Sequence, residues 1–483
     1  MSSTQLQNDR TLSSAIRNGR MNRRAWTITI MLILFQIVAF ADKAVLGLVA
    51  YKAIPELGIT TVQFGMIGSA FFFLYAIGSV FLGLIAGRTS VKWVIFAMGL
   101  AWAVLQFPML FGGGAAILLV TRILLGGAEG PATAMSLSSA HSWFKPSERA
   151  LPSNLIAIGS TLGPVLAAPF LAFIISNFGW RWAFGALGLL GLAWIIAWYI
   201  LGADGPFGSS KNKETAEPEA TAVANAPVRE KTATEIASDL RTKQYEDQKP
   251  VKLAWILLSG SFLVAVFGGF TNFWTQGFLT TWSPKYLAGV VNVSPEMVAL
   301  ITTFPWIFGA VVLLGLGFLG RNQMRRGKSV RIAIAAPFGV CLVLAGACFL
   351  ALPFTSGPMV IVLLTLGAGF SVIYPMAPSA MAYAVGAGQR PVIMATLGGV
   401  ASIGAIVSPT AVGMFMEQAG YRTAAKGTPE TAEMIGNMIS GVNQSLTIAG
   451  GLLLAAGILS VIFFNPDKTG QRLQRRLTQT SQN

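Results

Sequence analysis

The stretch RILLGGAEGP, residues 122–131, places an arginine and a glutamate seven positions apart within a long apolar and glycine-rich run. Charged side chains are rare in membrane helices, where they usually face the interior of the bundle and serve a function. Two questions follow: whether the chain is a membrane protein, and what Arg122 and Glu129 contact.

The composition answers the first question. The chain has 483 residues, of which 54% are hydrophobic and 11% charged, and its mean hydropathy is +0.63. Soluble domains carry about 25% charged residues. Apolar segments of roughly 20 residues, the length that crosses a bilayer as a helix, recur near residues 25–50, 62–87, 93–111, 115–140, 153–176, 182–202, 254–283, 297–319, 331–353, 357–384, 391–416 and 438–464. Abundant glycine suits closely packed membrane helices. We therefore predict an all-α membrane protein with twelve transmembrane helices.

The net charge of +15 fits the same class. Basic residues precede the first apolar segment, fill the loops after the second, fourth and eighth, and follow the twelfth, whereas the alternate loops hold few. The positive-inside rule then predicts an even number of spans with both termini in the cytoplasm. The first apolar run is too long for a signal-peptide core and lacks a small-residue cleavage site, so we expect a retained helix. The basic excess sets orientation and does not indicate nucleic-acid binding.

Residues 203–251 interrupt the apolar pattern with mixed charge, alanine, threonine and proline, a composition typical of a flexible linker. The predicted organisation is a basic cytoplasmic arm (1–24), a six-helix half (25–202), the linker (203–251), a second six-helix half (252–465) and a basic cytoplasmic tail (466–483). The halves echo each other weakly, with LGLIAGR at 82–88 and LGFLGR at 316–321. Paired halves around a midplane site are a common transporter design.

Ionisable side chains predicted inside the segments are Asp42 and Lys43 in the first and Arg122 and Glu129 in the fourth. Seven residues are nearly two helical turns, so Arg122 and Glu129 share a face about 10 Å apart along the axis. The rise per residue places Asp42 and Arg122 in the outer part of the bilayer and Glu129 deeper. If the two helices are neighbours, the four groups surround one cavity.

Burial favours a neutral carboxyl group and a nearby cation favours a charged one. We therefore expect Asp42 and Glu129 to couple transport to protons. The guanidinium fork of Arg122 and the point charge of Lys43 are candidate ligands for an anion. The alternative is that Arg122–Glu129 and Asp42–Lys43 are structural pairs. Buried pairs seldom stabilise a fold more than apolar residues do, and the confinement of these charges to one half favours a function.

Uncharged candidates for substrate binding lie on other segments. They are Tyr75 in the second, Ser160 in the fifth, Asn272 and Gln276 in the seventh, Tyr374 in the tenth and Ser402 in the eleventh. Packing is an equal alternative for Tyr75. His141, the only histidine, is expected to be structural, with a proton relay as the alternative. No cofactor or metal site is predicted, because the chain lacks a cluster of histidine, cysteine or acidic ligands and a phosphate-binding loop.

With these residues assembled, the chain resembles the anion:cation symporter family of the major facilitator superfamily. The resemblance covers nearly all of the chain outside the tails and linker. It rests on FADKAVLGLVA in the first segment, RILLGGAEGP in the fourth, SWFKPSERA after it, and FLTTWSPKYL at the end of the seventh. The family implies proton-coupled import of a small organic anion, with the two halves alternating access to a central site. It matches an acidic–basic pair to Asp42 and Lys43, an Arg–x6–Glu pair to Arg122 and Glu129, and a tyrosine to Tyr75. The short outer loops and the absence of a signal peptide suit a bacterial cytoplasmic membrane.

Some positions depart from the family pattern. Gly87 stands where the superfamily loop carries aspartate, and Arg321 occupies the equivalent place after the eighth segment. Lysine replaces the arginine of the first segment at Lys43, and Gly398 and Ser402 align where many sugar-acid carriers have asparagine. Fewer amides suggest a less hydroxylated substrate, such as an aromatic or short aliphatic carboxylate.

Two rival functions remain open at this point. A proton-coupled exporter of lipophilic drugs is suggested by Gly159-x-x-x-Gly163-Pro164, which is similar to an antiporter motif, although Ala167 and Ala168 replace its last glycines. A non-transporting sensor or scaffold would need a soluble signalling domain, which the linker and tail are too short to supply. The sequence predicts no enzyme, and we expect a monomer to be the functional unit.

Overall fold

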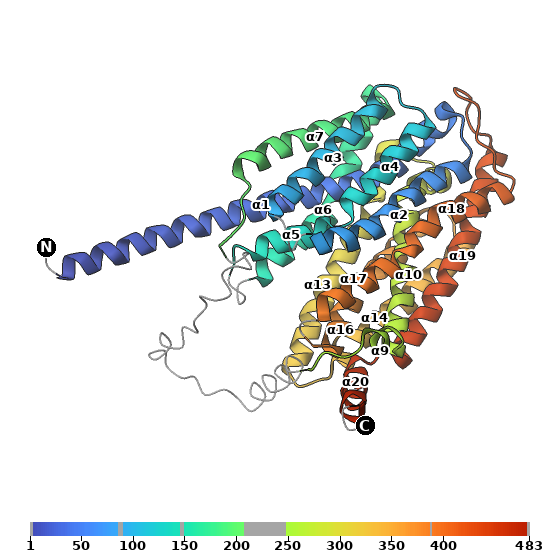
Figure 1. The fold of residues 1–483 in the computed structure, drawn as a ribbon. Coiled ribbons are helices and arrows are strands. Elements are labelled where there is room, and N and C mark those ends of the chain that lie inside the picture. Colours follow the sequence, from blue (N-terminus) through green and yellow to red (C-terminus); the bar gives the residue numbers. More distant parts are fainter. Residues whose placement is uncertain (1–2, 86–89, 145–148, 207–247, 387–388, 481–483) are drawn as a thin grey trace.

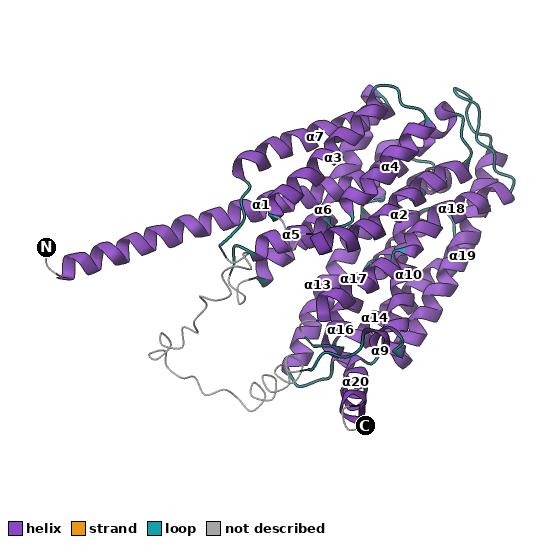
Figure 2. Cartoon of the chain, in the orientation of Figure 1, coloured by secondary structure: helices purple, strands orange, loops and turns teal. Residues whose placement is uncertain are grey.

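The computed structural model describes residues 3–85, 90–144, 149–206, 248–386 and 389–480. Every regular element within these ranges is a helix (Figure 2). Eleven helices in this part of the chain are long and apolar enough to cross a membrane. The twelfth is α10 (Gly260–Thr281), which has 22 residues but carries polar side chains such as Asn272 and Gln276 that lower its hydropathy. The chain is therefore an all-α, multi-pass membrane protein, as predicted.

The helices before the linker follow the predicted segments closely. They are α1 (Ser3–Leu57), α2 (Thr61–Ile85), α3 (Val91–Leu110), α4 (Ala115–Glu129), α5 (Ala132–His141), α6 (Ala150–Phe178) and α7 (Trp180–Leu201) (Figure 1). Helix α1 begins at Ser3, so the predicted basic arm continues into the first span without a break. The fourth span is divided into α4 and α5 at Gly130 and Pro131, because proline cannot donate a backbone hydrogen bond.

The helices after the linker are more often interrupted. They are α9 (Leu253–Leu257), α10, α11 (Ser283–Val291), α12 (Pro295–Ile301), α13 (Phe304–Arg325), η3 (Arg331–Ala335), α14 (Ala336–Ala351), η4 (Leu352–Phe354), α15 (Pro358–Ser371), α16 (Met376–Met381), η5 (Ala382–Ala384), α17 (Arg390–Ala401), α18 (Ile403–Gln418) and α19 (Ala432–Phe463). The predicted tail forms a further helix, α20 (Pro466–Thr480), which buries Leu473. Both cysteines, Cys341 and Cys348, are free.

Glycines of the opening stretch bring α4 against α2. A Cβ atom on Gly126 would lie 1.9 Å from the backbone oxygen of Phe71, and one on Gly130 would lie 2.2 Å from that of Tyr75. On the facing helix, a Cβ on Gly78 would lie 2.3 Å from the oxygen of Gly127. Backbones in such contact leave no room for a side chain. This packing holds the Arg122 and Glu129 helix beside Tyr75.

The helices before the linker (α1–α7) and those after it (α9–α19) meet tightly at one end of the bundle, which we call the closed end. Here α1 and α2 contact the last turn of α10 and the second half of α18. A Cβ on Gly65 would lie 2.3 Å from the oxygen of Pro409, and one on Gly47 would lie 2.6 Å from that of Thr280. The Ser69 and Thr410 hydroxyls are 2.7 Å apart. In Figure 1 the two groups of ribbons diverge toward the opposite end, where α7 ends and α9 begins.

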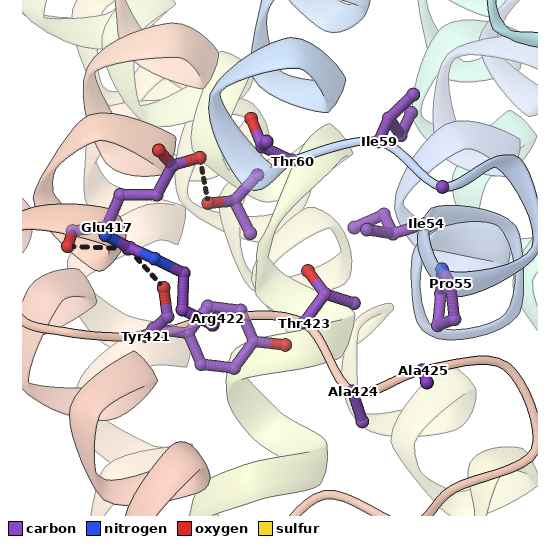
Figure 3. Close-up of a pocket in the computed structure, with 12 residues that line it drawn as sticks. Ile54, Pro55, Ile59, Thr60, Glu417, Tyr421, Arg422, Thr423, Ala424 and Ala425 are labelled. Atoms are coloured by element: carbon purple, nitrogen blue, oxygen red, sulfur yellow. Dashed lines mark hydrogen bonds between the residues drawn. The ribbon is translucent and has the colours of Figure 1, made fainter.

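A pocket of about 400 Å³ lies at the closed end between the α1–α2 turn and the segment after α18 (Figure 3). On one wall, the Glu417 carboxylate accepts hydrogen bonds from the Val62 N–H (2.9 Å) and the Thr61 hydroxyl (3.1 Å). An acidic group at a helix N-terminus satisfies free N–H groups and complements the helix dipole. Glu417 thereby joins α18 to α2, and the pocket contains none of the four ionisable residues predicted for the site.

Candidate functional site

The four ionisable residues converge, and their pairs are crossed between α1 and α4. The Arg122 Nη1 atom lies 3.1 Å from Asp42 Oδ2, and the Lys43 Nζ atom lies 3.8 Å from Glu129 Oε2. Each helix therefore contributes one cation and one carboxylate. The pairs differ from the structural alternative raised by the sequence, Arg122–Glu129 and Asp42–Lys43.

Asp42 is the more firmly held of the two carboxylates. Arg122 Nη1 donates to Asp42 Oδ2 and also to the Asp42 backbone carbonyl at 3.2 Å, while the Gln106 amide of α3 donates to Oδ1. Both carboxylate oxygens thus accept a hydrogen bond. The side chains of Arg122 and Asp42 are only 3% and 5% exposed, so this contact is shielded from solvent.

Glu129 is held loosely by comparison. Its residue is 1% exposed, and both carboxylate oxygens are buried without a hydrogen-bond partner. The Lys43 ammonium group that approaches it also lies 3.8 Å from the Phe40 ring and 4.6 Å from the Tyr75 ring. Aromatic faces attract cations, so Lys43 is shared between a carboxylate and two rings. Glu129 consequently has the weaker electrostatic support.

One small pocket adjoins the two cations within the described part of the chain. A pocket of about 10 Å³ beside Lys43 and Arg122 is closed by α2 and by the last turn of α10, and its remaining lining residues are Leu46, Gly68, Phe71, Phe72, Thr280 and Thr281. That volume accommodates about one water molecule. Because Thr280 and Thr281 belong to α10, the two cations lie near the interface between the helices before and after the linker, on the inner side of the closed end.

The uncharged candidates occupy several environments. The Tyr75 ring covers Lys43 and thus belongs to the charged cluster. Tyr374 lies in the break between α15 and α16, where its hydroxyl is buried without a partner and its ring packs edge-on to Phe273 at 5.2 Å. Asn272 donates to the Ser371 carbonyl and accepts from Gln276 at 2.9 Å, which joins α10 to α15.

Three other polar candidates are engaged locally. The Ser160 hydroxyl donates to the Ala157 carbonyl at 2.6 Å, and that of Ser402 donates to Gly399 at 2.8 Å. His141 Nε2 lies 2.7 Å from the Ser153 hydroxyl, which links α5 to α6. These contacts give each side chain a role within its own helix or between neighbours.

The antiporter-like glycines of α6 face α1. A Cβ on Gly163 would lie 2.6 Å from Phe40 Cβ, and one on Gly159 would lie 2.8 Å from the Ile33 oxygen. Close helix packing accounts for both. Gly87 lies outside the described residues, and the exposed Arg321 places its guanidinium 5.3 Å from the Phe318 ring.

Gln106 and Gln36 were missed by the sequence reasoning. Gln106 binds Asp42, and Gln36 Nε2 donates to the Thr133 hydroxyl at 2.9 Å. A signal was present, since each is an isolated amide within an apolar run. Gln36 lies in LFQIV and Gln106 lies in VLQFP. Buried amides require partners, so both could have been singled out, although not their contacts.

Comparisons with known proteins agree with this architecture. Residues 31–409 match the model of the Major Facilitator Superfamily, and the chain belongs to this superfamily of transporters. It is 25% identical to a D-galactonate transporter of Escherichia coli over 85% of this chain and 93% of that protein. It is 25% identical to a probable sulfoacetate transporter of Cupriavidus necator over 92% and 95%, and 26% identical to a hexuronate transporter of Bacillus subtilis over 60% and 63%.

Solved structures share the fold. A bacterial homologue of the lysosomal transporter Spinster in an inward-facing, unoccupied conformation has a TM-score of 0.70 at 19% identity, covering 93% of this chain and 98% of that one. A D-xylose–proton symporter has a TM-score of 0.66 at 11% identity, covering 92% and 99%. The predicted resemblance is confirmed, and the chain is a transporter rather than an enzyme.

Proposed function

We propose that this protein imports a small organic anion together with protons by alternating access. The observation that carries the proposal is the crossed pairing of two buried cations with two buried carboxylates, Arg122 with Asp42 and Lys43 with Glu129. The named relatives transport galactonate, sulfoacetate and hexuronate, which are organic anions. Both lines of support point to a substrate that carries negative charge.

The coupling follows from competition for the cations. An anion that binds Arg122 or Lys43 displaces a carboxylate, which is then buried without its partner. Isolated buried charges are costly and such groups bind a proton instead. Substrate and proton therefore enter together, and each carboxylate pairs again with its cation after both have left. The present arrangement corresponds to the state with cations and carboxylates paired and the closed end sealed.

We further propose that the closed end faces the outside of a bacterial cytoplasmic membrane, with both termini in the cytoplasm. The support is the basic residues that flank the spans at the linker end. The chain would act as a monomer, with residues 25–202 and 252–465 as the two moving halves.

Within this site, Tyr75 and Tyr374 would contact the body of the substrate, with Asn272, Gln276, Ser160 and Ser402 as further candidates. The tyrosines favour a carboxylate with an aromatic or short aliphatic body. Sugar acids, which carry many hydroxyls, offer the contrasting class for the test.

The test is uptake into vesicles that contain the purified protein and are exposed to an inward proton gradient. Labelled galactonate, glucuronate, sulfoacetate and benzoate form a suitable panel. We expect accumulation of at least one of them by the wild-type protein. Glu129→Gln should abolish accumulation but retain exchange, because a permanently neutral side chain cannot release a proton. Arg122→Ala should abolish both.

The matched control is Glu433→Gln at the exposed start of α19, which should accumulate substrate normally. Undiminished accumulation by Glu129→Gln would exclude the proposed role of Glu129. Increased drug tolerance on expression, without uptake of any acid in the panel, would favour the exporter instead.

A further inference from the structure

Gln106 is a buried amide with a carboxylate partner inside the bundle. The residue is 3% exposed on α3, and its Nε2 atom donates to Asp42 Oδ1. An amide nitrogen can only donate, and an ionised carboxylate can only accept. The contact is therefore satisfied by the charged form of Asp42.

The second oxygen of Asp42 is occupied as well. Arg122 Nη1 donates to Oδ2 at 3.1 Å and to the Asp42 carbonyl at 3.2 Å. Hydrogen bonds from an amide and a guanidinium to the same carboxylate favour its charged form. A proton on Asp42 would weaken both of these hydrogen bonds, because a neutral carboxyl group accepts less strongly than a carboxylate.

Glu129 presents the opposite surroundings. Its two oxygens are buried without a hydrogen bond, and Lys43 approaches one of them only to 3.8 Å. Of the two carboxyl groups, Glu129 is the one that a proton can occupy without weakening a hydrogen bond that it already accepts.

We propose that Gln106 is a positioning residue that keeps Asp42 ionised and paired with Arg122. While the closed end is sealed, protons therefore bind to and leave Glu129 rather than Asp42. The inference rests on the proposed function and states the order in which the two carboxyl groups bind protons, with Glu129 before Asp42. A movement of α3 or α4 that separates Asp42 from Gln106 or Arg122 would remove this support and favour protonation of Asp42.

Five helices contribute charged, aromatic or hydroxyl side chains around the Asp42 and Glu129 carboxyl groups, in addition to Gln106. Lys43 lies on α1, Arg122 on α4 and the neutral Tyr75 on α2. Helix α7 supplies the uncharged ring of Phe184, 5.3 Å from the Arg122 guanidinium. Helix α10 supplies the hydroxyls of Thr280 and Thr281 at the small pocket. Gln106 can therefore be replaced without removing a charge.

The experiment is infrared titration of the full-length protein in lipid nanodiscs, without substrate. The carbonyl band of a protonated carboxyl group is followed with pH and assigned by its loss in Asp42→Asn and in Glu129→Gln. Gln106→Met removes the donor and keeps an unbranched side chain of similar length. Gln36→Met is the matched control, because Gln36 is an equally buried amide that binds Thr133 instead of a carboxylate.

In the wild-type protein we expect the Glu129 band to persist to higher pH than the Asp42 band. Gln106→Met should move the midpoint of the Asp42 band upward by about one pH unit or more, the scale set by one hydrogen bond to a charged group. Gln36→Met should leave it in place. An Asp42 midpoint that is unchanged in Gln106→Met would overturn the proposal, as would a wild-type Asp42 band that persists above that of Glu129.

If Gln106→Met does not fold, Gln106→Asn serves the same purpose. Its amide is one methylene further from Asp42, so the midpoint should move in the same direction by a smaller amount, and no movement would count against the proposal. The titration does not depend on transport, so it tests the role of Gln106 independently of the uptake assay, which tests the proposed function. A shifted band in a protein that accumulates no anion would instead refute the proposed function alone.

Discussion

The crossed pairing makes a quantitative prediction about the energetic coupling between α1 and α4. The side chains of Arg122 and Asp42 are 3% and 5% exposed and their charged atoms are 3.1 Å apart. Removing one member of such a pair leaves an uncompensated buried charge, which destabilises a fold by about 3–5 kcal/mol. We expect losses of this size for Arg122→Gln and for Asp42→Asn.

The double variant should be more stable than the sum of these losses predicts, because neither charge remains. Residues in direct contact show interaction energies of about 0.5–3 kcal/mol, and a buried pair joined by a direct side-chain hydrogen bond belongs at the upper end. Lys43 and Glu129, 3.8 Å apart without a hydrogen bond, belong at the lower end. The coupling of Arg122 to Glu129 should be less than half of its coupling to Asp42.

These energies can be measured by unfolding the purified protein with sodium dodecyl sulfate in mixed micelles. Each cycle requires the wild-type protein, two single variants and the double variant, at one pH and one lipid composition. The decisive comparison is between the Arg122–Asp42 and Arg122–Glu129 cycles. If Arg122 couples more strongly to Glu129, the crossed arrangement is wrong and the pairing within α4 is correct.

Three further predictions concern packing, the closed end and pH. Gly126→Val should prevent accumulation of folded protein, since even a Cβ would lie 1.9 Å from the Phe71 oxygen. Gly317→Val is the control, because Gly317 is exposed and a Cβ there would have no atom from outside its own stretch of helix within 4 Å. Fluorescence-detected gel filtration should show normal expression of the control and loss of the Gly126 variant. Glu417→Ala removes two hydrogen bonds between α18 and α2. Spin labels at Thr60 and Thr428 should then show a longer distance component that is absent from the parent protein. An unaltered distance distribution would argue that Glu417 does not hold the closed end together. Burial raises the pKa of Tyr286 to about 12, and burial with the hydrogen bond to Glu430 raises the pKa of Tyr421. Since the unfolded chain releases these protons near pH 10 and the folded chain keeps them, the free energy of unfolding should fall as the pH rises from 10 to 12, and the double variant with Tyr286→Phe and Tyr421→Phe should show a shallower decline.

Much of the architecture could be predicted because hydropathy is a local property of the chain. Segments such as 93–111 and 115–140 correspond to α3 and to α4 with α5, and most expected boundaries lie within a few residues of the observed ones. The polar helix α10 was recognised although it is less apolar than the others, since it lies between a linker and a further series of spans. The helical course of residues 3–24 was not predicted, because basic and polar residues carry no apolar periodicity.

By itself, the sequence determined the class of protein, the number of spans and the four ionisable residues, because a charge within an apolar segment is conspicuous without any knowledge of neighbours. Only the tertiary structure decided the pairing. Asp42 and Lys43 are adjacent in sequence, but successive residues of a helix point about 100° apart, so the two side chains reach different partners on α4. The choice of partners depends on how glycines bring separate helices together, and so does the contact of Gln106 on α3 with Asp42. No local sequence pattern specifies this packing of helices.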